Sequence, residues 1–214
     1  MPRWKPETVW EGREVFIIGG GPSLKFFDWD LLHNECTIGC NSAIFLGPAV
    51  CKVAVFGDSI WLDKYRTEAE AYTKAGGVLF TNNPRYTKPP SWLWVMERKT
   101  VGLYHDALGW NWNTGAAAVN LALLLGAVKV YLLGFDMKLA KNGESNWHDK
   151  QVKGVGKDPI AVYHRFQEGF RRVRHDLPLK FPGREVINIH DDNSLDMFPT
   201  VSFKKFWGLR KAVA

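Results

Sequence analysis

Long apolar runs are absent from this 214-residue chain. A membrane-spanning helix needs roughly 18 consecutive apolar residues. The most apolar region, 115–133, contains Asn120 and Lys129 and is broken at Gly126. Residues 1–12 are polar and include tryptophan, which is unlike a secretory signal peptide. We therefore expect no transmembrane segment and, by default, a cytoplasmic protein.

Cysteine is scarce, with Cys36, Cys40 and Cys51 as its three occurrences. An odd number of cysteines fits a reducing compartment better than a disulfide framework. A structural zinc site would need a second ligand pair, and the sequence offers none. We therefore predict that all three are small buried core residues. Internal repeats and low-complexity segments are also absent.

Acidic residues are outnumbered by basic ones, which gives a formal net charge of +6. This mild excess permits a polyanionic partner, such as nucleic acid or an anionic glycan, without requiring one. The late basic residues are interpreted as a solvated surface and a basic tail. DNA contact through phosphates stays open for one set of them: Arg171, Arg172, Arg174, Lys204, Lys205, Arg210 and Lys211.

Tryptophan is abundant, with ten residues, and many of them flank Pro, Gly or Asn. This placement indicates loops rather than a core stripe. Loop aromatics can wall a ligand pocket or stack on sugars and bases, or they can simply cover a small sheet. The sequence does not decide between these two interpretations.

Short apolar runs alternate with amphipathic stretches along the chain. The runs predict strands at 14–18, 36–40, 52–56, 77–81, 128–133 and 185–189, and the stretches predict helices at 59–75, 113–126 and 160–175. Strands that are apolar on both faces are typical of a parallel sheet covered on both sides. The sequence thus predicts an α/β fold with a doubly wound, mostly parallel, Rossmann-like sheet of about six strands.

The length fits one nucleotide-binding α/β domain over 1–214. Two segments, 82–113 and 138–159, read as long loops or lids over the carboxyl edge of the sheet, where loops of that length usually carry function. The basic tail, 199–214, includes an amphipathic stretch at 203–213. We expect a packed terminal helix there, with contact to a membrane surface as the alternative.

A glycine turn follows the first predicted strand. Gly19, Gly20 and Gly21 precede Pro22 and Ser23. Glycines at this point let the backbone turn tightly and approach a phosphate. The spacing matches neither the dinucleotide fingerprint nor the P-loop, so oxidoreductases and P-loop NTPases are disfavoured.

Polar residues also follow the other predicted strands, where open α/β sheets bind ligands. Asn41 and Ser42 follow the second strand, Asp58 the third and Asp136 the fifth. Asn41 can instead form a turn, and Asp58 can instead cap a helix. Asn113, Thr114 and Gly115 open an apolar helix and are typical of an anion seat.

These motifs resemble a known family. GGGPSLK at 19–25, C-N at 40–41, T-G at 114–115 and ALLLGAVKVYLLGFDM at 122–137 are similar to bacterial sialyltransferases of glycosyltransferase family 42, which carry G-N-G-P-S-L-K, C-N, T-S-G and Y-L-S-G-I-D. The N-S-L at 193–195 looks like the family's P-N-S-L. Archaeal pterin pyrophosphokinase-like (DUF115) proteins share the opening and the G-x-D strand end. The G-F-D-M and W-H segments look like uncharacterised phage proteins, which would place the chain in a host cytoplasm.

The resemblance spans most of residues 14–200 and implies a nucleotide in the predicted cleft. The implied contacts are Gly20, Gly21, Ser23, Asn41, Asp58, Asn113 and Thr114. In the sialyltransferases this nucleotide is CMP carrying sialic acid. Gly20 stands where the family has a donor-contacting Asn, so CMP-, UDP- and GDP-linked sugars all stay open as donors.

The resemblance also implies a histidine general base after the G-x-D motif. Such a base takes the proton of the acceptor hydroxyl and needs a pKa near neutrality. His148 lies in a polar loop beside Asp149, which can orient it, whereas His164 lies on a predicted helix at a spacing closer to the family's. We rank His148 first.

The leading prediction is a nucleotide-sugar-dependent glycosyltransferase, with a glycan or a modified DNA base as acceptor. A second prediction is a diphosphokinase that uses ATP and Mg²⁺ on a pterin-like substrate, with Asp58 and Asp136 as metal ligands. A third is a binding protein that holds a nucleotide or DNA without turnover. Dependence on Mg²⁺ or Mn²⁺ and the oligomeric state stay open.

Overall fold

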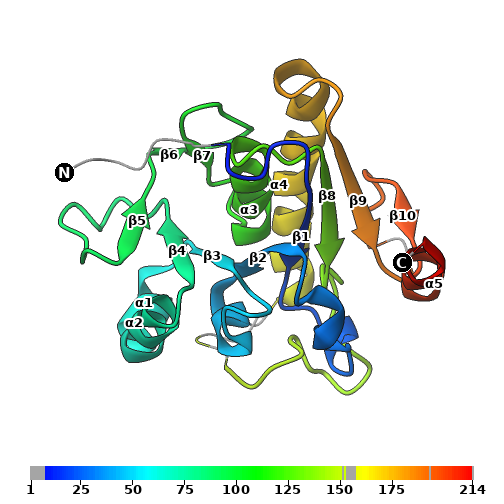
Figure 1. The fold of residues 1–214 in the computed structure, drawn as a ribbon, viewed down its shortest axis with the longest axis horizontal. Coiled ribbons are helices and arrows are strands. Elements are labelled where there is room, and N and C mark those ends of the chain that lie inside the picture. The colour runs from blue at the N-terminus through cyan, green and yellow to red at the C-terminus, as the bar shows by residue number, and fades with distance from the viewer. Residues whose placement is uncertain (1–7, 151, 153–157, 193, 214) are drawn as a thin grey trace.

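The computed structural model describes residues 8–150, 152, 158–192 and 194–213. Its centre is an eight-stranded sheet in which all neighbours pair in parallel. In spatial order the strands are β10 (Thr200–Val201), β9 (Glu185–Ile189), β8 (Lys129–Leu133), β1 (Glu14–Ile18), β2 (Cys36–Cys40), β3 (Val53–Phe56), β4 (Val78–Thr81) and β5 (Leu93–Val95). Figure 1 shows β1 and β2 at the middle of this sheet.

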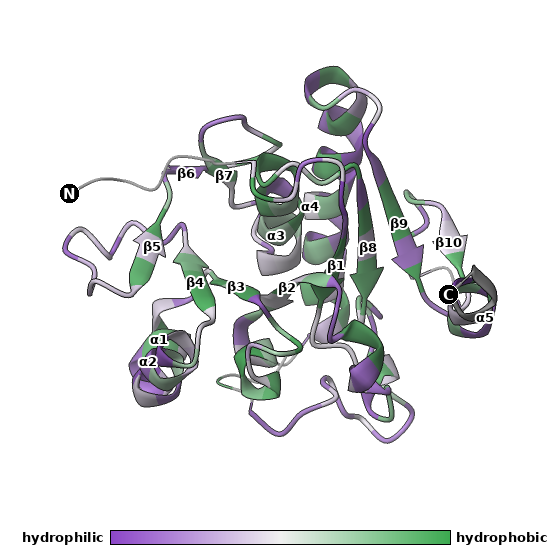
Figure 2. Cartoon of the chain, in the orientation of Figure 1, coloured by the Kyte–Doolittle hydropathy of each residue, from purple (hydrophilic) through white to green (hydrophobic). Residues whose placement is uncertain are grey.

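The central strands are buried on both faces, as a sheet with two helical layers requires. Val15, Phe16, Ile17 and Ile18 of β1 are all fully buried. Cys36, Cys40 and Cys51 are free and buried, which confirms their prediction. Figure 2 shows hydrophobic residues along β3, β4 and β8, whereas the loop after β8 is mostly hydrophilic.

Helices cover both faces of the sheet, which confirms the doubly wound fold. On one face, α3 (Thr114–Leu124) and α4 (Pro159–Lys180) pack against the core that contains Val15 and Ile17. The other face carries α1 (Ser59–Lys64), α2 (Arg66–Lys74) and α5 (Phe203–Val213). Three 3₁₀ segments share that second core: η1 (Pro22–Leu24), η2 (Trp29–Leu32) and η3 (Asn41–Leu46).

The predicted helix over 59–75 is two helices in the structure. The backbone of Tyr65 leaves the helical region, with φ −116° and ψ 32°, and this separates α1 from α2. Helix α4 starts one residue before the predicted 160–175, where the Asp158 carboxylate caps the N–H of Ala161. It also runs on to Lys180, with Pro178 in its last turn.

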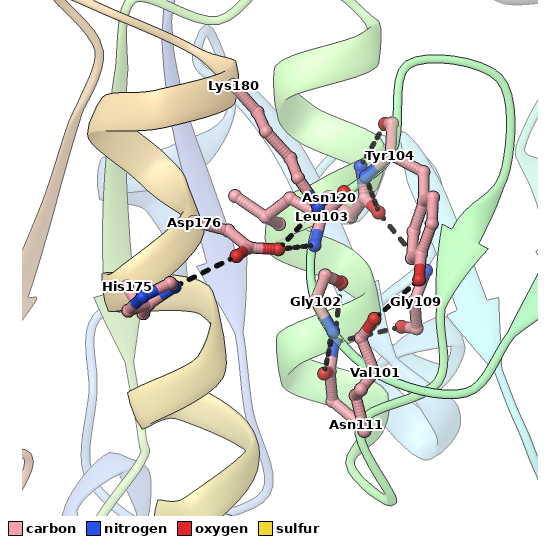
Figure 3. Close-up of polar contacts among 10 residues, drawn as sticks. All are labelled: Val101, Gly102, Leu103, Tyr104, Gly109, Asn111, Asn120, His175, Asp176 and Lys180. Atoms are coloured by element: carbon pink, nitrogen blue, oxygen red, sulfur yellow. Dashed lines mark hydrogen bonds and ion pairs between the residues drawn. The ribbon is translucent and has the colours of Figure 1, made fainter.

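The prediction of irregular structure over 82–113 is wrong in part. This segment contributes the edge strand β5 and a separate two-stranded parallel sheet of β6 (Arg98–Lys99) and β7 (Leu108–Gly109). Figure 3 shows how its second half is held. The buried Asn120 of α3 accepts hydrogen bonds from the N–H groups of Tyr104 and Gly109, both at 3.1 Å.

Two further residues in Figure 3 complete this network. The carboxylate of Asp176 on α4 accepts from the N–H of Leu103 at 2.8 Å and pairs with Lys180. The side chain of Asn111 bonds both backbone groups of Gly102. These contacts satisfy buried backbone groups that no ladder pairs, so the segment reaches the cleft with a fixed path.

The tail forms a packed helix, as predicted. Phe206 and Trp207 of α5 contact the ring of Phe16. Arg210 bonds the carboxylates of Glu14 and Glu35, at 2.7 and 2.6 Å. Within the described ranges, none of the helices has the length and apolarity to cross a membrane.

Candidate active site

A cavity of about 510 Å³ lies at the carboxyl ends of β1, β2, β3 and β8. We call it the cleft. Its lining includes these predicted residues: Gly19, Gly20, Gly21, Asn41, Ser42, Asp58, Asn113, Thr114, Gly115, Asp136 and His148. Pro22, Ser23, Asp149 and His164 are not among its lining residues. The sheet therefore brings the separate strand ends to one place, as their positions indicated.

The glycine turn packs tightly on the end of β8. Gly19 N–H donates to Leu133 O and Gly21 N–H to Gly134 O, both at 2.8 Å. A Cβ on Gly21 would overlap the carboxylate of Asp136 and the carbonyl of Gly134. A larger residue at position 21 would therefore clash with the end of β8. Glycine there also leaves the turn open to a ligand.

Asp136 anchors the turn from below and faces a histidine that the sequence did not single out. The backbone N–H and the hydroxyl of Ser23 both donate to its carboxylate, each at 2.7 Å. His190, at the end of β9, places Nε2 3.4 Å from Oδ1 of Asp136, and both residues are buried.

The pKa values of this pair move apart. Burial favours neutral Asp136, but the charge of His190 at 3.4 Å and the hydrogen bonds from Ser23 outweigh it, so the pKa of Asp136 lies below its ordinary value. Burial also favours neutral His190, yet Asp136 and Asp192 outweigh it and raise the pKa of His190. Each residue of the pair therefore favours the charged form of the other.

Asn41 presents an unused acceptor to the cleft. Its backbone has φ 51°, which is uncommon outside glycine, and its Oδ1 is buried without a hydrogen-bond partner among the described residues. A buried amide oxygen without a partner costs free energy, which a ligand donor would recover. Its neighbour Ser42 is engaged instead, donating to Lys150 O and accepting from the indole of Trp61.

Asp58 occupies the N-cap position of α1 but makes no side-chain capping hydrogen bond. The capping interpretation is therefore not realised, and the exposed carboxylate faces the cleft. Near Asp58, Arg98 packs its guanidinium over the ring of Trp110, 4.0 Å from the ring centre. Burial lowers the pKa of Arg98, and the charge of Asp58 acts against that shift.

The start of α3 is capped from within. Oδ1 of Asn113 accepts from the N–H groups of Gly115 and Ala116, at 2.8 and 3.4 Å. Its Nδ2 donates to Phe166 O of α4. This cap uses N–H donors that an anion seat at Thr114 would need, so this helix end offers fewer donors to an anion than the sequence indicated.

The two candidate histidines differ in position. His148 lines the cleft, and its Nδ1 accepts a 3.2 Å hydrogen bond from the N–H of Lys150. Burial lowers the pKa of His148, while the charge of Asp149 acts against it. Asp149 is 84 % exposed and pairs with Lys150, so it does not hold the imidazole by a hydrogen bond. His164 lies on α4 with an exposed side chain.

Several lining residues were not singled out from the sequence. Three are cationic, namely Lys138, Lys150 and Arg165. Lys138 pairs with Asp192 and Lys150 with Asp149. The other such residues include Asn146, Tyr163, Trp110 and Trp112. Trp112 is 44 % exposed and has φ 51°. Only the abundance of loop tryptophans had pointed toward any of these residues.

A metal role was predicted for Asp58 and Asp136. Within the described part of the chain, no group of three or more His, Cys, Asp and Glu side chains is placed to hold a metal ion. The oxygens of Asp136 already accept two bonds from Ser23. This pair therefore fits Mg²⁺ or Mn²⁺ poorly without ligand atoms from a substrate.

The comparisons with known proteins agree with this geometry at the level of fold. No family model matches the chain, and no curated protein matches it. Two solved structures of the sialyltransferase CstII from Campylobacter jejuni do, both at 13% identity. The structure with cytidine-5'-monophosphate gives a TM-score of 0.54, with 89% of this chain and 85% of that chain covered. The structure with CMP-3FNeuAc gives 0.52, with 88% and 86% covered. The chain thus has a sialyltransferase-like α/β fold.

Proposed function

We propose that this protein is a glycosyltransferase that moves a sugar from a nucleotide-sugar donor to a hydroxyl acceptor. The observation that carries the proposal is the cleft, which combines cationic side chains, an unpaired amide oxygen and a titratable histidine at the carboxyl edge of the sheet. The protein also shares its fold with the sialyltransferase CstII, whose structures contain cytidine-5'-monophosphate or CMP-3FNeuAc.

Charge favours an anionic ligand. Lys138, Lys150 and Arg165 outnumber the two carboxylates that line the cleft. Asp136 is paired with His190, and Lys138 and Lys150 are paired with Asp192 and Asp149, which lie outside the lining. A nucleoside phosphate supplies the complementary charge, and its base or sugar supplies donors for Oδ1 of Asn41. CMP is the first donor nucleotide to test, with UDP and GDP next.

The reaction needs a proton acceptor. The hydroxyl oxygen of the acceptor attacks the anomeric carbon, the bond from that carbon to the phosphate oxygen breaks, and the nucleotide leaves with the electron pair. We assign the hydroxyl proton to His148. Its lowered pKa keeps the ring neutral near pH 7, and Nδ1 carries the lone pair, since it accepts from Lys150 N–H. The hydroxyl would displace that long backbone contact.

A nucleotide-binding panel tests the proposal, with CMP, CDP, UDP, GDP and ATP, each with and without Mg²⁺ or Mn²⁺. A ligand at a hundred times its Kd stabilises by about 2.7 kcal/mol, which raises the Tm by about 5–10 °C. A pyrimidine or GDP response without metal supports a glycosyltransferase. An ATP response that requires metal favours the diphosphokinase instead. No response from any nucleotide would overturn the proposal.

A further inference from the structure

The segment 144–150 is fastened directly onto the glycine turn. The backbone N–H of Trp147 donates to Gly20 O at 3.0 Å, and its indole Nε1 donates to Gly19 O at 2.9 Å. The indole also contacts the ring of Trp29, with centroids 4.9 Å apart. Trp147 therefore holds this segment against the glycine turn.

Both ends of the segment are held as well. Glu144 pairs with Lys25 just after the glycine turn, at 2.6 Å. At the other end, Ser42 donates its hydroxyl proton to Lys150 O at 2.8 Å. The segment thus runs across the cleft from the end of β1 to the end of β2.

Four polar residues of this segment line the cleft. They are Ser145, Asn146, His148 and Lys150, whereas Trp147 and Asp149 do not line it. The backbone bends at residues 147–149. Asn146, His148 and Lys150 thus form a row of three polar residues beside the glycine turn.

Asn146 is the member of the row nearest the turn. A Cβ built on Gly20 would lie 2.5 Å from Oδ1 of Asn146. A side chain at position 20 and the carboxamide of Asn146 therefore compete for one space. Because position 20 is glycine, the carboxamide takes that space, and the hydroxyl of Ser145 steadies it by accepting from Nδ2 at 2.9 Å.

We propose that Asn146 is a nucleotide-binding residue of the cleft, which contacts the phosphate of the bound nucleotide beside the space that glycine at position 20 leaves open. The inference rests on the proposed function, because it needs a nucleotide in this cleft. Oδ1 of Asn146 lies beside Gly20 and one N–H of Nδ2 bonds Ser145, so the second N–H of Nδ2 is the donor for a phosphate oxygen. Lys150 on the same row, which pairs with Asp149, supplies positive charge.

The test measures CMP binding by calorimetry in four proteins: wild type, Asn146→Gly, Gly20→Asn, and the double variant. Loss of one hydrogen bond to a charged group weakens binding about ten- to a hundredfold, which we expect for Asn146→Gly. Gly20→Asn alone should also weaken binding, because two side chains then share one space. The double variant should recover most of the affinity, because the amide of the asparagine at position 20 then takes the space that the amide of Asn146 occupies in the wild type.

A second variant keeps the test decisive if Asn146→Gly fails to fold. Asn146→Asp preserves the shape but places a carboxylate beside the phosphate. It should weaken CMP binding at least tenfold and leave cytidine binding within threefold. Equal losses for CMP and cytidine would contradict contact with the phosphate.

The control is Asn34→Gly, which removes an exposed amide outside the lining of the cleft and should change nothing. If the wild type binds CMP and both Asn146→Gly and Asn146→Asp bind it equally well, the proposed role of Asn146 is wrong, while the proposed function stands. Absence of nucleotide binding by the wild type would defeat the proposed function and, with it, this inference.

Discussion

The carboxylate of Asp136 accepts two hydrogen bonds from one residue, Ser23, through its backbone N–H and its hydroxyl, both at 2.7 Å. The two residues lie 113 positions apart in the chain. This pair joins the glycine turn after β1 to the end of β8, so the cleft has a fixed floor. His190 at the end of β9 balances the charge of Asp136 from the other side.

Removal of this carboxylate should destabilise the fold. Asp136→Ala leaves Ser23 and the imidazolium of His190 without their partner, and breaking a buried ion pair costs about 3–5 kcal/mol. Urea unfolding measures the loss. Asp149→Ala, which truncates a side chain that is 84 % exposed, is the control and should stay within about 0.5 kcal/mol. If Asp136→Ala lowers the free energy of unfolding no more than Asp149→Ala does, the Asp136 cluster does not stabilise the fold.

The same pair predicts a pH dependence of stability. The raised pKa of His190 means that its contribution is complete below its unfolded value of 6.5 and is lost as the pH rises through the folded value. The lowered pKa of Asp136 gives a contribution that is present above 3.8 and lost as the pH falls through its folded value. The free energy of unfolding of wild type should therefore exceed that of His190→Gln most at pH 5–6. A gap that widens above pH 7 would contradict the ion pair.

The base assignment predicts a specific activity loss. His148→Gln should lower kcat about 10²–10⁴-fold while nucleotide affinity stays within threefold, because it removes the proton acceptor and keeps the lining polar. His164→Gln, on the exposed side of α4, should keep activity within twofold. The reverse result would transfer the role to His164.

The lowered pKa of His148 also fixes where activity falls. A base works only when unprotonated, so kcat/KM should hold steady from pH 8 downward and decline only below the ordinary histidine value of 6.5. A pH profile of the wild type measures this limb. A decline that begins above pH 7 would require another group as base.

Trp112 separates ligand binding from stability. Its φ of 51° means that Trp112→Gly relieves a strained backbone, while its ring is 44 % exposed, so the change also removes the buried part of the ring. These two effects oppose each other, so the free energy of unfolding should change by less than about 2 kcal/mol. If the ring stacks on a base or sugar, nucleotide or acceptor affinity should fall about tenfold. Unchanged affinity for both ligands would make Trp112 a bystander.

The interior of the sheet followed from the sequence because its strands are apolar on both faces. Glu185–Ile189 and Cys36–Cys40 were predicted with the bounds that the structure has. The edge strands were missed because they carry too little pattern. Thr200–Val201 has two residues, and Leu93–Val95 lies in a Pro- and Trp-rich stretch.

The candidate site divides along similar lines. Asn41, Asp58 and Asp136 were found because each follows a strand that the pattern reveals. Asn146 was missed because its position depends on the hydrogen bonds of Trp147 to the distant glycine turn. His190, in contrast, could have been predicted from the sequence, because it follows a predicted strand, as Asp136 does.

The most direct test of the glycosyltransferase assignment is the release of nucleotide from CMP-, UDP- and GDP-sugars, with and without a hydroxyl acceptor. We expect release from one nucleotide class, which the acceptor accelerates and which is lost in His148→Gln. Tight nucleotide binding without release from any donor, and with no effect of His148→Gln, would contradict it and leave a binding protein in the same cleft.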